Sequence, residues 1–379
     1  MEMEFTKEND LVRQMVRKFA ENEVATVAAE IDKTEQFPLD TVKKMAKYGL
    51  MGMSFPSEYG GNDSDFVSYI IVMEELAKAC GTTSVIVAAH TSLCASPIFN
   101  FGTEEQKRKY LPGLLSGEKL GAFGLTEPNA GSDAGSQQTM AVLEGDHYIL
   151  NGSKVFITNA GFADVYIIFA MTDKAKGTRG ISAFIVEKNF PGFSIGKIEE
   201  KLGIRASSTG ELVMADCKVP KENLLGKENK GFGVAMATLD SGRIGIAAQA
   251  LGFAEAAYAQ CLEHVKQRRQ FGKPLSKFQG LQWYLADMNV QVEAAKLLVY
   301  KAAFKKQQGL PISLDAAQAK LFAAQTANAV ATKAIQVLGG YGYTMDYPVE
   351  RIMRDAKITE IYEGTSEVQK MVIAANILK

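Results

Sequence analysis

A glutamate beside a glycine, near the carboxyl end of the chain, is the strongest candidate for acid–base chemistry. Glu363 and Gly364 lie in the segment IYEGTSE (361–367). Glycine costs a helix interior about 1 kcal/mol relative to alanine, and Ser366 followed by Gln369 has the spacing of a capping box. The final helix is therefore predicted to begin at Ser366. That start leaves Glu363 in the preceding loop, where a ligand could approach over Gly364.

The same segment also fits an acidic stripe on a helix. Glu360, Glu363 and Glu367 are three and four residues apart, which is the spacing of side chains on one exposed helix face. If the loop interpretation holds, the helix N-terminus offers unpaired N–H groups to an anion such as a diphosphate. The same terminus keeps Glu363 ionised, so a useful general base also needs burial against residues such as Tyr362 to raise its pKa.

Three glycine-rich polar stretches could bind a cofactor. FGLTEPNAGSD (123–133) carries two hydroxyls, FITN (156–159) places an aromatic ring beside a hydroxyl, and QVLGGYG (336–342) follows an alanine-rich helix. Glycine permits close backbone approach, N–H groups and hydroxyls bind polar ring edges or phosphates, and an aromatic face stacks on a flat heterocycle. The competing interpretations are an interdomain loop, an alternating strand and a glycine helix stop.

Arginines supply two further candidate sites. Arg243 closes DSGR (240–243) within a helical stretch, and Arg268 and Gln279 flank the turn FGKP (271–274). Arginine suits phosphate groups, but on a helix it more often lies in an ion pair or on a solvated face. The three histidines lie in separate regions and the four cysteines form no C-x-x-C pair. A histidine-based site, a zinc site and disulfides are therefore not expected, and the cysteines are predicted to be reduced core thiols.

The elements that position these groups fall into three blocks. Helical periodicity dominates residues 1–120, short apolar runs between turn signals fill 121–225, and helical periodicity returns over 226–379. Because helices and strands are grouped in separate blocks instead of alternating along the chain, the sequence disfavours a Rossmann domain. In addition, no nucleotide-binding glycine motif is complete. The predicted fold is mainly α, with a central antiparallel, barrel-like β-domain between two helical domains.

Apolar spacing predicts two helices. Leu11, Met15 and Phe19 recur every four residues near the start of the chain. From Leu285 to Ala302, apolar residues step in threes and fours until GLP (309–311) ends the pattern. The second run predicts a long helix of a bundle.

Local signals predict helix ends and strand turns. Thr103 and Gln106 have the spacing of a capping box, and Pro112 is predicted to interrupt the helix that they begin. Asn-Gly at 151–152 and Pro-Gly at 191–192 predict turns between strands.

Composition favours a small-molecule partner. The chain has 379 residues, with 42 Lys and Arg against 43 Asp and Glu, and a net charge of -1. No basic excess favours nucleic acid or an anionic membrane surface, and polar residues interrupt the apolar runs before the roughly 20 positions of a membrane span. The acidic start, MEMEFTKEND, lacks the pattern of a targeting signal. A cytoplasmic, bacterial-type protein is expected.

Six segments taken together, and in this order, resemble a known family. GLTEPNAGSD, FIT, RRQFGKPL, QVLGGYGY, MRDAKI and IYEGTSEVQ are similar to segments of the acyl-CoA dehydrogenases, most closely the short-chain, butyryl-CoA type of anaerobic bacteria. The resemblance covers essentially the whole chain. It implies an N-terminal helical domain (1–120), a central β-domain (121–225) and a C-terminal four-helix domain (226–379). It also implies one FAD per subunit and a homotetramer built as a dimer of dimers.

The resemblance also implies residue roles. Glu363 is the expected catalytic base. The residues expected to contact substrate are Ser132, Asp240, Ser241, Gly242, Arg243, Tyr362 and Gly364. Those expected to contact FAD are Phe123, Gly124, Leu125, Thr126, Gly131, Ser132, Phe156, Ile157, Thr158, Arg268, Phe271, Gln279, Gln336, Val337, Leu338, Gly339, Gly340, Thr365, Ser366 and Glu367. The residues from 268 to 340 would reach it across a subunit interface, and no metal is expected.

The implied activity is α,β-dehydrogenation of a short-chain acyl-CoA. Butyryl-CoA would become crotonyl-CoA, or the reverse in an anaerobe, with electrons exchanged with an electron-transferring flavoprotein. Glu363 would remove the α-proton while the β-hydrogen leaves as hydride to flavin N5, and hydrogen bonds would stabilise the enolate oxygen. Some relatives carry the base at the position of Gly242, which cannot abstract a proton. The alternatives are an acyl-CoA oxidase that uses O2 and a non-catalytic binding protein on the same fold.

Overall fold

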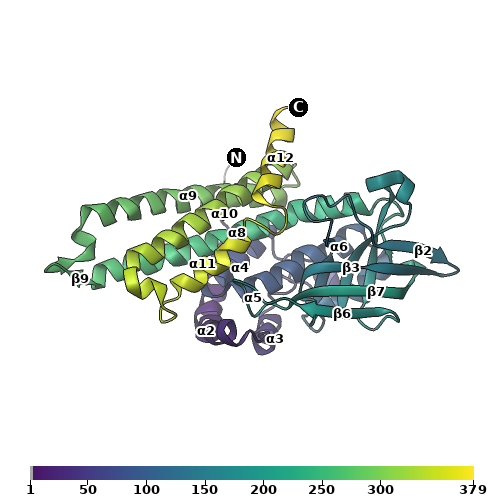
Figure 1. The fold of residues 1–379 in the computed structure, drawn as a ribbon, viewed down its shortest axis with the longest axis horizontal. Coiled ribbons are helices and arrows are strands. Elements are labelled where there is room, and N and C mark those ends of the chain that lie inside the picture. Colours follow the sequence, from purple (N-terminus) through teal and green to yellow (C-terminus); the bar gives the residue numbers. More distant parts are fainter. Residues whose placement is uncertain (1–2) are drawn as a thin grey trace.

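The β-domain is separate in space (Figure 1), whereas the N-terminal and C-terminal helices share one hydrophobic core. The computed structural model describes residues 3–379, and the first two residues of the N-terminal segment lie outside it. Figure 1 shows a β-domain at one end of an elongated molecule and long helices that extend from it to the other end. The predicted fold class, helices, a central β-domain and a helical bundle, is confirmed.

The N-terminal part is helical. Its elements are α1 (Lys7–Phe19), η1 (Ala20–Val24), α2 (Ala25–Thr34), α3 (Leu39–Lys47), η2 (Ser57–Tyr59), α4 (Phe66–Ala79), α5 (Gly81–Ala88), the π-helical η3 (Ala89–Ala95), α6 (Ser96–Phe101) and α7 (Glu104–Leu115). Helix α1 buries Val12, Val16 and Phe19, whereas Leu11 is 65% exposed. The predicted helix is confirmed, but steps of four drift around a helix of 3.6 residues per turn, so its buried stripe follows residue 12 rather than Leu11.

Helix α7 confirms the predicted start and corrects the predicted end. Thr103 Oγ1 accepts the N–H of Gln106 (3.3 Å), and Gln106 Oε1 accepts the N–H of Thr103 (3.0 Å). Pro112, however, lies inside the helix, which continues to Leu115. Leu111, Leu114 and Leu115 are buried, so packing maintains the last turn despite the hydrogen bond that proline cannot donate.

The continuous stretch α5–η3–α6 runs against the β-domain and the bundle. Among residues 3–379, this 21-residue stretch is the one helix long and apolar enough, by length and composition, to cross a membrane, and 78% of its apolar window is buried within the protein. His90 Nε2 donates to Leu114 O (3.0 Å), and its Nδ1 accepts the N–H of Gly121 (3.1 Å). Burial lowers the pKa of His90 to about 4, so this histidine is a neutral structural link.

Eight strands form the central sheet, in the order β6-β7-β3-β2-β4-β5-β8, with β1 against β4. The strands are β1 (Gly121–Gly124), β2 (Met140–Glu144), β3 (His147–Thr158), β4 (Val165–Met171), β5 (Ile181–Glu187), β6 (Phe193–Ile198), β7 (Thr209–Pro220) and β8 (Leu224–Leu225), with η4 (Lys174–Gly180) and η5 (Lys221–Asn223) between them. The sheet is mainly antiparallel, as predicted, and β1 pairs with β4 in parallel.

One predicted turn is wrong and the other is confirmed. Asn151 and Gly152 lie inside β3, where the register against β7 shifts in a bulge. A Cβ on Gly152 would lie 2.5 Å from Thr139 Oγ1, so the glycine allows close backbone approach instead of making a hairpin turn. The Pro-Gly pair at 191–192 does form the turn between β5 and β6.

Five helices complete the chain: α8 (Gly231–Gln267), α9 (Gln279–Gln307), α10 (Ser313–Leu338), α11 (Val349–Ile358) and α12 (Ser366–Ile377), with β9 (Arg269–Gln270), β10 (Lys273–Pro274), η6 (Leu275–Lys277) and η7 (Gly339–Tyr343) between them. Helix α9 buries Met288, Val292 and Val299, as predicted. Helix α8 packs Val234 and Ala235 with the sheet, and its later residues lie in the bundle core. Residues 240–243 therefore lie where the two cores meet. All four cysteines are buried and free, which confirms that prediction.

Candidate active site

The predicted base lies in a short loop between α11 and α12. Glu363 and Gly364 both have left-handed backbone, with φ of 51° and 94°. A Cβ on Gly364 would lie 2.6 Å from Gln369 Nε2, so both the dihedral angle and the space require glycine. A non-glycine residue in this conformation costs roughly 1–3 kcal/mol, and such residues cluster at functional sites.

Helix α12 begins at Ser366 as predicted, but its cap is Thr365. Thr365 Oγ1 accepts the N–H of Val368 (3.3 Å), and the Gln369 amide donates to Gly364 O (2.8 Å). The predicted capping box at Ser366 is therefore wrong by one residue. Thr365 has the extended ψ of 165° that an N-cap residue adopts. The acidic-stripe interpretation is also wrong, because Glu363 precedes the helix.

The carboxylate of Glu363 lies against the middle of α8. A Cβ on Gly242 would collide with Glu363 Oε2 and would lie 3.1 Å from Leu93 Cδ2. Gly242 therefore has a steric role in addition to lacking a basic group. Because glycine has no side chain, the Glu363 carboxylate can occupy the space beside α8.

Burial raises the pKa of Glu363 to about 7, and the positive charges of Lys320 and Arg243 oppose that rise. Glu363 is half-buried as a residue, but its Oε2 is shielded from water and has no hydrogen-bond partner in the described part of the chain. Its neighbour Tyr362 donates a hydrogen bond to Gln249 Oε1 of α8. A carboxylate with a pKa near neutrality is suited to general base catalysis.

The segment 240–243 lies beside the base loop. Arg243 is buried, and its Nη1 donates to Asp240 Oδ1 (2.5 Å). The Arg243 Nε, also buried, has no hydrogen-bond partner among the described residues and lies 3.8 Å from the position of a Cβ on Gly364. Ser241 is buried on the same helix. The fold therefore brings together the predicted base, its glycine and the arginine from 120 positions earlier in the chain.

Two residues of this site were missed at the sequence level. Lys320 is fully buried, and its Nζ donates to Gly364 O (2.6 Å). Gln369, also fully buried, donates to the same carbonyl. The signal was present in AAQAKLFAAQ (316–325), where one lysine interrupts an alanine-rich apolar run. A lysine that is flanked in sequence by apolar residues within a predicted helix is a candidate for burial.

The two predicted flavin segments of the β-domain lie side by side. The N–H of Val155 donates to Thr126 O (2.9 Å). Phe156 has a φ of 60° where the register of β3 and β7 shifts, and its side chain is 65% exposed. Thr126 and Thr158 are half-buried, whereas the side chains of Phe123, Leu125 and Ile157 belong to the core. This edge of the domain presents an aromatic ring and two hydroxyls. Gly131 and Ser132 lie in the exposed loop that follows.

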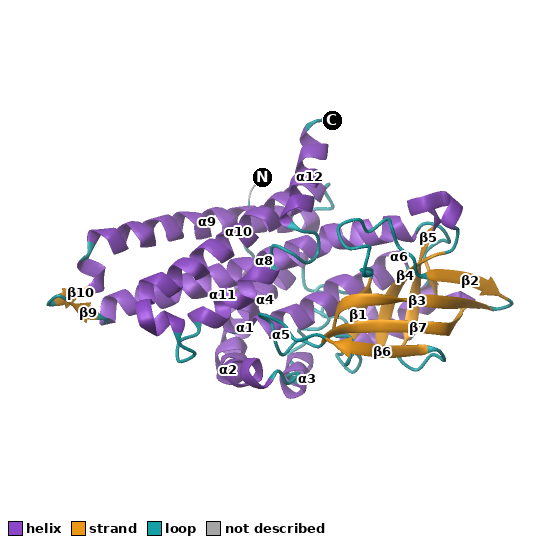
Figure 2. Cartoon of the chain, in the orientation of Figure 1, coloured by secondary structure: helices purple, strands orange, loops and turns teal. Residues whose placement is uncertain are grey.

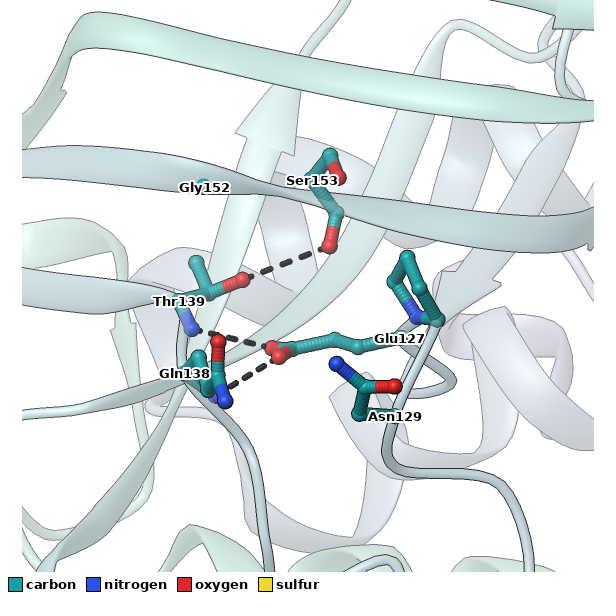
Figure 3. A pocket seen from close by; sticks show the side chains of 7 residues that line it. Glu127, Asn129, Gln138, Thr139, Gly152 and Ser153 are labelled. Carbon is teal, nitrogen blue, oxygen red and sulfur yellow. Dashed lines mark hydrogen bonds between the residues drawn. The ribbon is translucent and has the colours of Figure 1, made fainter.

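A buried ion pair holds the loop that carries Thr126. Lys154 Nζ donates to Glu127 Oε1 (2.7 Å) and to Leu125 O (3.2 Å). Figure 3 shows the Glu127 carboxylate directed at the backbone N–H groups of Gln138 and Thr139. These residues lie at a pocket of about 300 Å³ whose lining is Glu127, Pro128, Asn129, Gln138, Thr139, Gly152 and Ser153.

Replacing Lys154 with methionine is expected to lower the free energy of unfolding by about 3–5 kcal/mol, because Glu127 would remain buried without its counter-ion. The measurement is urea unfolding of the purified protein. Lys176 is the matched control, because its ion pair with Asp173 lies at the surface, and Lys176→Met is expected to cost less than about 1 kcal/mol. Equal losses in the two variants would contradict the role given to the buried pair.

The remaining predicted FAD residues lie at the far end of the bundle. Figure 2 shows the β9–β10 hairpin at the opposite end of the molecule from the sheet. The Arg268 guanidinium lies 5.2 Å from the Tyr341 ring centroid, which joins the hairpin to η7. Phe271 is 92% exposed, and Gln279, Gln336, Gly339 and Gly340 are also exposed. Val337 and Leu338 have their side chains in the core. One chain therefore does not bring these residues together with Phe123, Thr126 or Phe156.

The start of α12 supplies the last predicted group. Thr365 is half-buried and caps the helix, Glu367 is exposed, and the buried Ser366 Oγ has no hydrogen-bond partner among residues 3–379. This hydroxyl is available to a polar ligand, whereas the N–H groups of Ser366 and Val368 already donate to Glu360 O and Thr365 Oγ1.

Comparisons with known proteins agree along the whole chain. The family descriptions that match are "Acyl-CoA dehydrogenase, N-terminal domain" over residues 6–118, "middle domain" over 122–217 and "C-terminal domain" over 229–378. The short-chain specific acyl-CoA dehydrogenase of Clostridium acetobutylicum is 66% identical over 379 residues, which cover 100% of both chains.

Solved structures agree equally well. Butyryl-CoA dehydrogenase from Megasphaera elsdenii is 53% identical, with a TM-score of 0.98 over 100% of both chains. A chain in the structure described as the electron transferring flavoprotein of Acidaminococcus fermentans is 54% identical, with a TM-score of 0.99 and the same coverage. The aligned regions include both segments that form the base site, 240–243 and 361–367.

Proposed function

The chain belongs to the acyl-CoA dehydrogenase family and is an FAD-dependent oxidoreductase, and from that premise we propose that it dehydrogenates short-chain acyl-CoA thioesters with Glu363 as the base. The observation that carries the proposal is the position of Glu363: a shielded carboxylate, with a pKa raised to about 7, that fills the space left by Gly242. The proposed reaction is butyryl-CoA to crotonyl-CoA, or its reverse in an anaerobe. The short-chain and butyryl-CoA relatives support this substrate class.

The residues of the β-domain fit a flavin. An exposed aromatic ring at Phe156 lies beside the hydroxyls of Thr126 and Thr158, on adjoining backbone segments. At the far end of the bundle, a Cβ on Gly339 or Gly340 would meet open space. We assign both groups to FAD, the second to the FAD of a neighbouring subunit. When bound, FAD supplies the two-electron acceptor that the reaction requires.

The chain itself supplies the proton chemistry and the position of the substrate. Glu363 Oε2 takes the α-proton, since it is shielded from water and accepts no other hydrogen bond among the described residues. The N–H of Glu363 donates to no other group of residues 3–379, so it is free to bind the thioester oxygen as negative charge develops there. Gly364 leaves room beside the base for the thioester, and Asp240 with Arg243 orients it. Ser132 is assigned to the CoA moiety.

Partners and location follow from the same premise. The chain of the Acidaminococcus fermentans structure, whose description names an electron transferring flavoprotein, supports such a protein as the electron partner. The separation of the two groups of FAD residues within one chain supports a homotetramer in which subunits complete one another's sites. Bacterial relatives support a cytoplasmic location. Nucleic acid and membrane partners are not part of the proposal.

The test is anaerobic mixing of the holoenzyme with butyryl-, hexanoyl- and octanoyl-CoA. Butyryl-CoA is expected to bleach the oxidised flavin absorbance and to have the highest kcat/KM, since each added methylene is worth about 1–3 kcal/mol of discrimination. Absence of bleaching with all three thioesters would contradict the proposal. Rapid peroxide formation in air, with slow transfer to a flavoprotein acceptor, would replace it with an oxidase.

A further inference from the structure

Lys320 is a fully buried cation that makes no close ion pair in the described part of the chain. Among residues 3–379, two lysines are fully buried, Lys154 and Lys320. Lys154 lies 2.7 Å from the Glu127 carboxylate, whereas the described part of the chain offers Lys320 no ion pair within 4 Å. Burying an unpaired ammonium opposes folding. The position of this lysine therefore calls for a reason other than stability.

The hydrogen bond of Lys320 is to the loop that carries the base. Its Nζ donates to Gly364 O at 2.6 Å from α10, and Gln369 Nε2 donates to the same oxygen at 2.8 Å from α12. Gln369 Nε2 also lies 3.4 Å from Glu363 O. Two buried donors from different helices thus hold one carbonyl, directly after two residues with positive φ. We call this arrangement the carbonyl clamp.

The charge of Lys320 also acts on the Glu363 carboxylate, although the two groups form no ion pair within 4 Å. Burial lowers the pKa of Lys320 to about 8, and Glu363 is the strongest influence that opposes this shift. Arg243 is the other cation near Glu363, but its charge is partly neutralised by Asp240. The titratable groups that act on Glu363, or on the two cations beside it, come from several elements: Tyr69 of α4, Asp240 and Arg243 of α8, Lys320 of α10, Glu360 and Tyr362 of the base loop, and Glu367 of α12.

We propose that Lys320 is a positioning residue for proton abstraction: from α10 it holds the base loop through the carbonyl clamp, and its positive charge favours the ionised form of Glu363. The proposal rests on the proposed role of Glu363 as the base. Lys320 does not take the proton. It fixes where the carboxylate lies and at what pH it can accept one.

The first test is Lys320→Met, which has a similar length and no charge. The wild-type holoenzyme is expected to gain kcat/KM with rising pH through about pH 7, the pKa of Glu363. In Lys320→Met this limb should move upward by about one pH unit, because an opposite charge has been removed. At neutral pH kcat should fall about 10- to 100-fold, because the Glu363 carboxylate would no longer be held in place for proton abstraction. KM should change little.

Two further variants separate the effect of the carbonyl clamp on the base loop from the effect of the Lys320 charge. Gln369→Leu removes the other half of the carbonyl clamp and leaves the ammonium in place, so kcat should fall while the pH limb stays near 7. Lys370→Met removes the same charge from an exposed site one residue further along α12, so both the limb and kcat should stay near those of the wild type. A limb that moves equally in Lys320→Met and Lys370→Met would overturn the proposal.

A measurement without turnover keeps this proposal distinct from the function itself. The protonated carboxyl band of Glu363, isolated as an infrared difference between wild type and Glu363→Gln, gives its titration midpoint directly. The midpoint should rise when Lys320→Met is introduced into both proteins, and an unchanged midpoint would overturn the proposal. A shifted midpoint in an enzyme that no acyl-CoA reduces would refute the proposed function alone. If Lys320→Met does not retain flavin, Lys320→Gln replaces it with the same expected shift.

Discussion

Replacing Glu363 with glutamine is expected to lower the rate of flavin reduction by butyryl-CoA by about 10²- to 10⁴-fold, the typical contribution of a general base. Glutamine has nearly the same shape, so it can occupy the space beside Gly242, but its amide cannot accept the α-proton. FAD should remain bound, because the substitution keeps the shape of the side chain and leaves Thr365, Ser366 and Glu367 unchanged. The measurement is anaerobic rapid mixing of the holoenzyme with butyryl-CoA, after its flavin content has been determined.

Glu360→Gln is the matched control for that substitution. Glu360 lies three residues earlier, and its carboxylate pairs with Lys357 (2.7 Å) rather than with α8. This variant is expected to retain most of the wild-type rate. Reduction of the flavin at the ordinary rate in Glu363→Gln would show that another group removes the proton.

The same substitution should also change how stability depends on pH. The pKa of Glu363 rises from an ordinary 4.5 to about 7 in the folded protein. The folded state therefore holds a proton that the unfolded state releases, and this contribution to stability is lost as pH rises from about 4.5 through 7. Glutamine carries no such cost, so Glu363→Gln should be more stable than the wild type by up to about 3 kcal/mol at pH 8. The difference in Tm should be small at pH 5.

Local sequence signals predicted the elements well and their fine structure less well. The capping box at Thr103 depends on neighbours in sequence, and it was confirmed. Pro112 continues a helix because buried leucines hold the last turn, and Gly152 makes a bulge because Thr139 lies against it. In both of these latter cases, a contact distant in sequence overrides a local preference.

The active site shows the same limit of prediction from local sequence. The glycine and the helix signal correctly placed Glu363 in a loop before α12. The pKa of Glu363 is raised by burial in the folded chain, and the charged groups that act on it, Arg243 and Lys320, lie 120 and 43 positions earlier. No local pattern could place Lys320 beside Gly364, because that contact depends on how α10 and α12 cross. The resemblance to a family supplied residue roles, but it did not indicate the carbonyl clamp.

Gly242→Ala is expected to lower kcat about 100-fold without loss of stability. The added methyl would collide with Glu363 Oε2, and the flexible carboxylate, rather than the helix, would move. A displacement of about 1 Å at a reacting group can cost about 10²-fold in rate. Alanine is meanwhile favoured over glycine within a helix by about 1 kcal/mol, so the Tm should be unchanged or higher. Steady-state kinetics with butyryl-CoA and thermal unfolding of the holoenzyme measure the two effects separately.

A control variant and a double variant test whether Gly242 acts through Glu363. Gly233→Ala makes the same change on α8 where a Cβ would meet open space, and it should leave kcat unaltered. If Gly242 acts only by giving Glu363 room, Gly242→Ala should have little further effect on the rate once Glu363→Gln has removed the base, since residues that act as a unit are not additive. Fully additive losses in the double variant would mean that Gly242 contributes by another route, such as direct contact with the thioester.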